Sequence, residues 1–398
     1  MKIAFVIPWY GENIPGGAET ECRATAENLQ IAGMEIEILT TCVKEFLSDW
    51  NTDYYKEGLY EVNHIPVRRF SVRKRDTALF DSINYKLMQN QKISLQEEEI
   101  FIRDMINSDN LYSYIREHGS DYDFFLFIPY MFGTTYYGSQ IHPEKSIIIP
   151  CLHDESYAYL SIYKKVFRQV AALIFHSDPE KDLANRLYQP SHRQIVLGEG
   201  IDTAFTFNPE RFRKKYKIFS PFILYAGRKE SGKNVPLLLD FFMRFKQDTL
   251  SDLKLVIIGS GNIRIPAECK SDIIDLGFVS RQDKYDAYAA ATILCQPSVN
   301  ESFSIVIMES WLCETPVLVH GNCAVTRDFC VKCNGGLYFT YYYEFKESVQ
   351  FLLDHFSIRK KMGQSGKQFV LNNFSWEKIV DNYKKELLNI KNLPYRTD

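Results

Sequence analysis

The sequence predicts an α/β protein in which two doubly wound, Rossmann-like domains face each other across a cleft. Short apolar runs rich in β-branched and aromatic residues alternate with helical patterns through most of the chain, as buried parallel strands and their crossover helices do. The length of 398 residues suits two domains of roughly 150–200 residues each. A polar and basic segment between Val196 and Phe222 interrupts the strand pattern, which then restarts.

The first domain is predicted over residues 1–205. Its expected strands are apolar runs that end at Gly, Pro or Ser, and a helix is expected over residues 18–33. The strands lie at residues 2–9, 35–41, 123–130, 146–152 and 172–177. Residues 81–118 are polar, helical in period and poor in β-branched residues, so we interpret them as a helical insertion.

The second domain is predicted over residues 206–375, with helices over residues 234–247 and 281–291. Its expected strands lie at residues 222–227, 253–260, 273–279, 292–298 and 315–321. Residues 376–398 are predicted to contain a C-terminal helix that packs back on the first domain.

The composition excludes several classes of protein. A formal net charge of −3 gives no global field that attracts nucleic acid or anionic lipid. The nine cysteines are odd in number and lie mostly in apolar runs, which is typical of reduced thiols. The N-terminal apolar run stops at Pro8 without a cleavage site, and no apolar stretch reaches the ~20 residues of a membrane span. We expect a cytoplasmic protein, at most peripheral at the inner face of the cytoplasmic membrane.

The segment Gly227–Asn234, GRKESGKN, differs by one residue from a phosphate-binding P-loop. A P-loop requires Ser or Thr in place of Asn234, and also an apolar strand that ends in Asp, which none of the predicted strands does. Arg228 and Lys233 nevertheless follow a predicted strand, at the edge where open parallel sheets bind ligands. They suit a diphosphate, arginine by its bidentate fork and lysine as a point charge. The alternative is a solvated basic turn.

A second segment, residues 300–309 (NESFSIVIME), favours the phosphate interpretation. Glu301 follows a predicted strand, Ser302 is a candidate N-cap, and the helix carries Glu309 about one and a half turns in. Free backbone amides at this helix mouth would face a bound anion. These amides belong to Phe303, Ser304 and Ile305. Glu309 lies in an apolar run, where a ligand diol such as a ribose would satisfy its carboxylate; the alternative is an ordinary glutamate on the helix surface.

Together these segments resemble the retaining glycosyltransferases with the GT-B fold, in particular family 4, the glycosyl transferases group 1. NESFSIVIMESWLCETPVLV is similar to the family's element of two glutamates separated by seven residues, and GRKESGKN resembles its G-R-x-x-x-x-K-[GN] loop. The first of these matches the family at Glu301, Phe303, Glu309, Pro316 and Val317. Four further stretches resemble family elements in the same order along the chain: PGGAET, CLHDE, LGEGID and DLGFVSRQDKYDAYAAA.

Two departures from the family affect the expected site. Ser302 and Ser304 replace the two usual glycines, which makes the backbone amides less open to a phosphate. After HGNC the family has a glycine-rich loop and a glutamate, where this chain has AVTRDFCVKCNGGLYF. Contacts with the donor sugar in that region are therefore not carried over.

The resemblance implies transfer of a hexose from a nucleotide-diphosphate sugar to an acceptor hydroxyl, with retention of the anomeric configuration. The catalytic residues that it implies are Arg228, Lys233, Glu301 and His153. The donor-binding residues that it implies are Gly16, Gly17, Arg228, Lys233, Val279, Glu301, Phe303, Ser304, Ile305 and Glu309. Glu19 and Tyr130 are the implied acceptor contacts. His153 is alternatively a hydrogen-bonded core histidine, and Glu19 a helix-start carboxylate.

The expected donor is UDP-glucose or another UDP-hexose, with GDP-mannose next. The expected acceptor is a saccharide or a lipid-linked saccharide, in cell-envelope or exopolysaccharide synthesis. The basic run Val67–Arg75 either meets anionic lipid or an acceptor phosphate, or forms a strand with a solvated edge. The aromatic segment Phe124–Tyr137 either stacks on acceptor sugars or belongs to the core. Two other functions remain open: a nucleotide-sugar epimerase of the same fold, and a non-catalytic nucleotide-sugar-binding protein.

We expect neither a metal ion nor another cofactor. Asp121 and Asp123 form the carboxylate pair that metal-dependent glycosyltransferases use, but they stand at the amino end of a predicted strand, away from the ligand edge. Four cysteines have a zinc-like spacing without a histidine pair, and packing is the alternative for them. They are Cys313, Cys323, Cys330 and Cys333.

Overall fold

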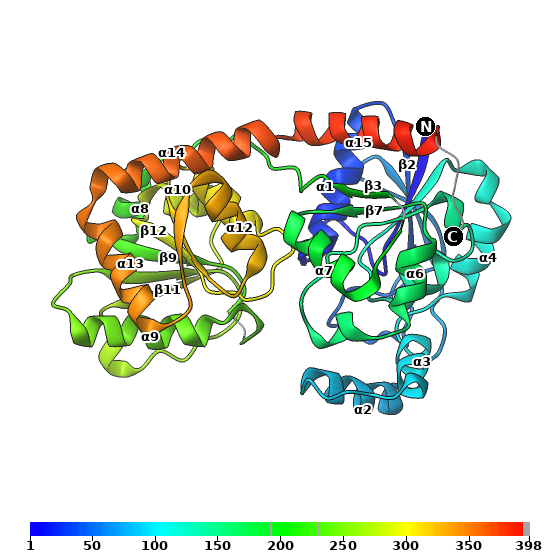
Figure 1. Cartoon of the computed structure of the whole chain (residues 1–398), viewed down its shortest axis with the longest axis horizontal. Coiled ribbons are helices and arrows are strands. Elements are labelled where there is room, and N and C mark those ends of the chain that lie inside the picture. Colours follow the sequence, from blue (N-terminus) through cyan, green and yellow to red (C-terminus); the bar gives the residue numbers. More distant parts are fainter. Residues whose placement is uncertain (192, 230, 393–398) are drawn as a thin grey trace. The chain divides into compact units, whose positions relative to one another are not determined.

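The computed structural model describes residues 1–191, 193–229 and 231–392, without the side chains of Ser231 and Glu268. It divides into two compact units (Figure 1). The first comprises Met1–Gly200 and the chain from Ile379 onward, and the second comprises Ile201–Lys378. Helix α15 (Trp376–Lys391) begins in the second unit and continues in the first. Residues 393–398 of the predicted C-terminal segment lie outside the described residues.

The first unit is built on an eight-stranded sheet with the order β3-β4-β2-β1-β5-β6-β7-β8. Its strands are β1 (Lys2–Val6), β2 (Glu35–Thr41), β3 (Gly58–Val62), β4 (Ile65–Phe70), β5 (Phe124–Phe127), β6 (Ser146–Ile148), β7 (Ala172–Phe175) and β8 (Arg193–Val196). Strand β3 is antiparallel to β4, and the other pairs are parallel. The strand order reverses between β1 and β5, which places the ligand-binding edge of a doubly wound sheet at their carboxyl ends.

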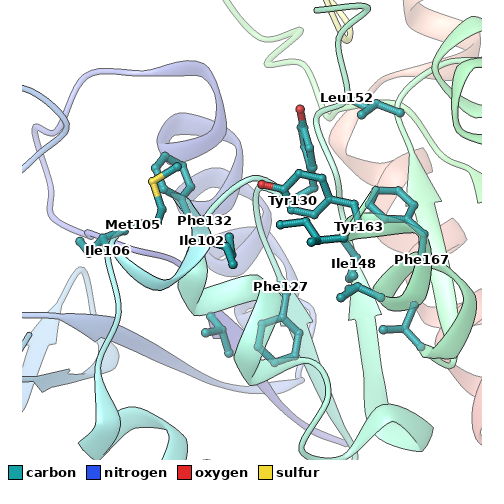
Figure 2. Packing of buried hydrophobic residues seen from close by; sticks show 14 of the residues in the cluster. Ile102, Met105, Ile106, Phe127, Tyr130, Phe132, Ile148, Leu152, Tyr163 and Phe167 are labelled. Carbon is teal, nitrogen blue, oxygen red and sulfur yellow. The ribbon is translucent and has the colours of Figure 1, made fainter. Parts of the chain in front are cut away.

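Helices surround the sheet of the first unit (Figure 1). They are α1 (Gly17–Ile31), α2 (Thr77–Met88), α3 (Leu95–Arg103), α4 (Asp109–Glu117), α5 (Gly133–Gly138), α6 (Tyr163–Gln169) and α7 (Asp178–Tyr188). Helices α2, α3 and α4 occupy the region predicted to be a helical insertion, and a side chain caps the start of each: Asp76, Ser94 and Ser108 respectively. Figure 2 shows Met105 and Ile106, which follow α3, lying beside Phe132 in the buried cluster, so the insertion is joined to the core.

The second unit contains a six-stranded, parallel sheet with the order β11-β10-β9-β12-β13-β14. Its strands are β9 (Phe222–Ala226), β10 (Lys254–Ile258), β11 (Ile273–Gly277), β12 (Ile293–Gln296), β13 (Val317–His320) and β14 (Gly336–Phe339). The order reverses between β9 and β12, so a ligand crevice is expected at the carboxyl ends of these two strands. The prediction of two doubly wound, Rossmann-like domains is therefore confirmed.

The helices of the second unit pack closely around this sheet. They are α8 (Pro209–Tyr216), α9 (Val235–Asp248), α10 (Arg281–Ala290), α11 (Ile305–Leu312), α12 (Ala324–Cys333), α13 (Tyr342–Asp354) and α14 (Phe356–Asn373). Helix α14 approaches α11 through glycines: a Cβ atom on Gly363 would lie 1.8 Å from the backbone oxygen of Glu314, and one on Gly366 would lie 2.2 Å from the ring of Trp311. Only residues without a side chain permit this approach.

The basic run Val67–Arg75 is largely used inside the first unit. Arg68 donates to Glu37 at 2.9 Å, and the buried Arg69 donates to the backbone oxygen of Tyr10 at 2.7 Å. These guanidinium groups therefore stabilise the sheet rather than form a free cationic patch. Within the described residues, no helix combines the length and the hydropathy that crossing a membrane requires.

The close approach of α14 gives a test of the packing. We expect Gly363→Ala to destabilise the second unit by about 1–3 kcal/mol, because the new methyl group meets backbone that cannot rotate away. Thermal unfolding measures the effect. Ser365→Ala, at an exposed position of the same helix, is the matched control and should leave the unfolding temperature nearly unchanged. Equal unfolding temperatures for the two variants would contradict the packing described here.

Candidate functional site

The loop after β9 is held in place by a lysine that sequence analysis did not single out. The ammonium of Lys229 lies 2.7 Å from Asp275 of β11, and its side chain is almost fully buried. Its backbone N–H also donates to the oxygen of Ser260 at 2.9 Å. The charge of Lys229 is thus used structurally, whereas Arg228 beside it is exposed. The sequence feature that could have indicated this pair is Asp275, a lone carboxylate within an apolar strand.

Asn234 has a structural role that Ser or Thr would not fulfil. Its φ of 57° lies in the left-handed region, which asparagine tolerates better than most residues. Its side-chain amide donates to the backbone oxygen of Pro297 at 3.0 Å and so joins the loop to the end of β12. Helix α9 starts at the next residue, Val235. This loop therefore closes by an amide contact at the position where a P-loop has its magnesium ligand.

Lys233 and Glu301, both predicted to contact the donor, are paired with each other. Their charged groups lie 2.7 Å apart, with side chains 27% and 10% exposed. The amide of Gln296, the last residue of β12, also donates to the Glu301 carboxylate at 3.1 Å. This pairing fixes the lysine at the carboxyl ends of β9 and β12. Because an ammonium has three donors, it can bind an anion without leaving Glu301.

The helix after Glu301 starts later than predicted. Helix α11 begins at Ile305, its N-cap position is Ser304, and Ser302 does not cap it. Ser304 has a φ of 80°, the left-handed conformation that glycine adopts at low cost, which accounts for the glycine of the related family at this position. The amides of Phe303 and Ser304 therefore precede the helix and that of Ile305 begins it. The Phe303 ring is buried against Phe374.

Glu309 is buried, as its apolar neighbours suggested, but the chain itself balances its charge. Lys284 of α10 lies 2.6 Å from its carboxylate, and the hydroxyl of Tyr288 donates to it at 3.0 Å. Burial is the main cause that raises the pKa of Tyr288, and the charge of Glu309 raises it further. The phenol therefore stays protonated and can donate a hydrogen bond. The alternative of an ordinary glutamate on the helix surface is wrong, and the predicted contact with a ribose stays a prediction. Sequence analysis missed both partners, although their spacing of four residues places them on one face of a helix.

A hollow of about 240 Å³ adjoins this group of residues. It is bounded by the ends of β9 and β10, by Phe278 and Val279 after β11, and by Lys284, Tyr288 and Val306. Its volume lies below the range of about 300–1,000 Å³ that drug-sized ligands occupy, so it suits a single flat ring system. Of the predicted donor-binding residues, the structure brings Arg228 and Val279 to this hollow, with Glu309 reached through Lys284.

In the first unit, the turn before α1 is built around Glu19. The indole N–H of Trp9 donates to its carboxylate at 2.5 Å. The other carboxylate oxygen lies over Gly16, where a Cβ atom would be only 1.8 Å away, and the φ of 142° also favours glycine there. Gly17 is the first residue of α1. Glu19 thus has the contacts of a helix-start carboxylate, and its role toward an acceptor stays a prediction.

His153 follows β6 and is half-buried, with its Nδ1 atom 3.6 Å from Glu155. The residue before it is anchored: the N–H of Leu152 donates to Glu180 at 2.7 Å, and the N–H of His176 donates to the same carboxylate at 2.6 Å. Glu180 therefore ties the end of β7 to the loop that carries His153. Sequence analysis did not identify this anchor.

A buried ionic cluster surrounds that anchor. The Nε2 atom of His176 lies 2.5 Å from Glu21, and the thiol of Cys151 donates to Glu21 at 3.5 Å. Burial alone lowers the pKa of His176, but the charges of Glu21 and Glu180 outweigh it and raise the pKa to about 10. Burial raises the pKa of Glu180. The histidine is therefore positively charged at neutral pH and shared between two carboxylates.

Tyr130 does not offer the acceptor contact that was predicted. It is 2% exposed and lies in the hydrophobic core, with its ring centroid 5.0 Å from that of Tyr163. Figure 2 shows the two rings together near Leu152 and Phe167. Aromatic residues at this strand end serve packing, which is the alternative that the sequence left open for the segment Phe124–Tyr137.

Potential metal ligands gather at one place within the described residues. Atoms of Glu21, Cys151 and His176 lie within 4.8 Å of one another. The two aspartates of the predicted carboxylate pair have other partners, since Asp121 contacts His118 and Asp123 contacts Lys391. Over the part of the chain that the structure describes, the four cysteines with zinc-like spacing form no such group. All nine cysteines are free thiols.

Most of the second unit resembles a known family of proteins. Residues 208–369 match the family described as glycosyl transferases group 1. Over this region, which is less than half of the chain, the protein is similar to the glycosyl transferases group 1. The matched region contains the loop after β9, the Lys284–Glu309 pair and the start of α11. The predicted site residues of the first unit lie outside it.

Related proteins share the whole architecture at low identity. An uncharacterised glycosyltransferase of Methanocaldococcus jannaschii is 22% identical, and the match covers 98% of this chain and 97% of the relative. Sucrose-phosphate synthase of Thermosynechococcus elongatus superposes with a TM-score of 0.71 at 16% identity over 98% of each chain. HepE of Anabaena in complex with UDP-glucose gives 0.64 at 15% identity, over 98% of this chain and 100% of its own. The chain thus has the GT-B fold of these glycosyltransferases.

The buried cluster predicts a pH dependence of stability. Because the pKa of His176 rises from 6.5 to about 10 on folding, its stabilisation is complete below pH 6.5 and is lost as the pH rises through 10. We expect the unfolding temperature of the first unit to fall over this interval, and His176→Gln to remove most of that slope.

The control for this experiment is His64→Asn, at an exposed histidine with a positive φ that asparagine tolerates. Thermal unfolding followed by circular dichroism from pH 6 to 10 measures all three proteins. The control should keep the slope of the unmodified chain. A slope that His176→Gln leaves intact would show that the histidine is neutral in the folded protein.

Proposed function

We propose that this chain is a retaining glycosyltransferase that moves a hexose from a UDP-sugar, without a metal ion, to a saccharide or lipid-linked acceptor. UDP-glucose is the favoured donor and GDP-mannose the next. The observation that carries the proposal is the group of charged side chains at the carboxyl ends of β9 and β12: Arg228, Lys233 and Glu301, beside the hollow and the buried Glu309. Synthesis of a cell-envelope or extracellular polysaccharide is the proposed setting.

The nucleoside end of the donor fits the hollow. Its volume of about 240 Å³ and its borders from Phe278, Val279 and Tyr288 suit a flat base. Glu309, fixed by Lys284, offers carboxylate oxygens to the two hydroxyls of a ribose. Since Lys284 already balances its charge, Glu309 does not pay the full desolvation cost when the nucleoside excludes water.

The diphosphate end fits the cations beyond the hollow. Arg228 and Lys233 are the two positive groups, and the backbone amides at the start of α11 add dipoles that favour an anion. When the bond from the sugar to the diphosphate breaks, negative charge develops on the leaving group. Groups that are fixed before the reaction stabilise this charge without reorganising. Lys233 is such a group, because its pairing with Glu301 holds it in place.

The sugar end is assigned to Glu301 and His153. Glu301 keeps one carboxylate oxygen on Lys233 and Gln296, which leaves the other for a sugar hydroxyl. His153 belongs to the other unit and is proposed to bind the donor sugar from its anchored loop. The choice of UDP is supported by HepE, whose structure contains UDP-glucose.

The role of Lys233 is tested by Lys233→Ala. We expect transfer from UDP-glucose to fall by roughly 10²–10³-fold, because one fixed cation at the leaving group is lost. Release of UDP measures the reaction, and the shift of the unfolding temperature by UDP measures binding. Lys214→Ala, at an exposed lysine of α8, should behave as the unmodified chain. Unchanged transfer by Lys233→Ala, with the fold intact by circular dichroism, would refute the assignment.

The absence of a metal requirement is tested separately. If Arg228 and Lys233 replace a divalent ion at the diphosphate, transfer should persist after treatment with EDTA. The rate is measured before and after chelation, and again with added Mg²⁺ or Mn²⁺. Loss of transfer that either ion restores would show that the mechanism depends on a metal.

A further inference from the structure

A buried lysine joins two strands of the second sheet that are not neighbours. Strand β10 lies between β9 and β11 in that sheet. Lys229, in the loop after β9, places its ammonium 2.7 and 3.0 Å from the two carboxylate oxygens of Asp275 in β11. The side chain of the lysine is 2% exposed and that of the aspartate 25% exposed. The pair therefore spans the end of β10, and its cationic member is shielded from water.

On the β9 side, the pair helps to fix the backbone of Arg228, the residue assigned to the diphosphate. The backbone oxygen of Arg228 accepts from the hydroxyl of Tyr225 at 2.6 Å. The backbone N–H of Lys229 donates to the oxygen of Ser260 at 2.9 Å, and its side chain is held by Asp275. These contacts hold the backbone from which the guanidinium of Arg228 extends.

On the β11 side, the same carboxylate shapes the turn that leads to the hollow. The Oδ1 atom of Asp275 also accepts from the backbone N–H of Gly277 at 2.9 Å. Gly277 ends β11 with a φ of 67°, and its oxygen accepts from the N–H of Gly259 at 2.8 Å. The next two residues, Phe278 and Val279, border the hollow. Asp275 thus connects Lys229 with the segment proposed to face the nucleoside.

The loop after β10 lies in close contact with the loop after β9. A Cβ atom on Gly259 would be 2.0 Å from the backbone oxygen of Gly227, and one on Gly261 would be 3.3 Å from the backbone nitrogen of Lys229. Closely packed groups transmit a displacement to their neighbours. A shift of the loop that carries Arg228 is therefore passed on toward β11, both through this backbone and through the ion pair.

We propose that Lys229 and Asp275 are positioning residues for the donor, because the pair sets the place of Arg228 relative to the segment Phe278–Val279. The inference rests on the proposed function, since it assumes that the nucleoside occupies the hollow while Arg228 binds the diphosphate. The two ends of a nucleotide are covalently joined, so both make full contact only when these two segments are correctly spaced. Spacing that is fixed before binding lowers the cost of ordering the site.

The test compares the affinities for UDP and for uridine by isothermal titration calorimetry on the full chain, with uridine measured in competition with UDP. Under the proposal, uridine contacts only the hollow, whereas UDP also reaches Arg228. In Lys229→Met we expect UDP to bind roughly 10-fold more weakly, and uridine to stay within about 3-fold, because Asp275 still holds Gly277. In Asp275→Ala both ligands should bind more weakly, because both connections are lost.

A double variant separates positioning from a direct effect of the lysine charge. If Lys229 acts through Arg228, adding Lys229→Met to Arg228→Ala should weaken UDP no further. If the buried ammonium attracts the diphosphate directly, the two losses will multiply instead. That result would overturn the positioning role.

Lys254→Met is the matched control for the loss of an ion pair. It removes the 2.7 Å contact between Lys254 and Asp272, which lies where β10 and β11 begin, at the edge of the sheet opposite the hollow. We expect Lys254→Met to keep the ratio of the UDP and uridine affinities of the unmodified chain. If Lys229→Met keeps that ratio as well, the pair between Lys229 and Asp275 serves stability alone and the proposal is overturned.

The unmodified chain distinguishes a failure of this inference from a failure of the proposed function. If UDP binds to it and Lys229→Met leaves the ratio unchanged, the positioning role is wrong and the proposed function stands. If UDP at high concentration neither binds nor raises the unfolding temperature of the unmodified chain, the proposed function fails, and the positioning role fails with it.

Discussion

The pairing of Lys284 with Glu309 is the interaction on which the site of the second unit depends. A carboxylate that is 7% exposed is costly to bury alone, and a lysine 2.6 Å away makes its ionised form tolerable. The pair also connects α10 with α11, the two helices that border the hollow. Lys229 with Asp275 and Lys233 with Glu301 repeat the arrangement at neighbouring strand ends. In each pair, the lysine and its carboxylate belong to segments that are distant in the sequence.

This dependence on distant partners explains what could be predicted. The strands were predictable because a parallel strand covered on both faces reads as one apolar run, as FILYAG and LKLVIIGS do. Glu309 stood out because it interrupts such a run. Its partner lies 25 residues away on another helix, and only the tertiary structure brings the two together. The start of α11 was misplaced because capping rules favour Ser302, whereas the left-handed turn at Ser304 is set by its surroundings.

The first unit shows the same limit in a different form. Composition cannot tell a core tyrosine from one that faces a ligand, and Tyr130 was misassigned for that reason. The cluster of Glu21, His176 and Glu180 was not visible, since its members belong to α1, the end of β7 and α7. Yet it anchors the loop of His153, one of the residues that the sequence did identify. The sequence motif identified His153, and the structure shows the contacts that hold its loop in place.

Helix α15 bears on the order in which the chain assembles during synthesis. Its residues Ile379, Tyr383 and Leu387 are buried, and Lys391 contacts Asp123, so the first unit is complete only with the last helix. A ribosome releases the entire second unit before it releases that helix. Until α15 is made, the N-terminal half exposes the apolar surface that this helix later covers, while the C-terminal half can already fold. Final closure of the earlier-made portion therefore follows synthesis of the second unit.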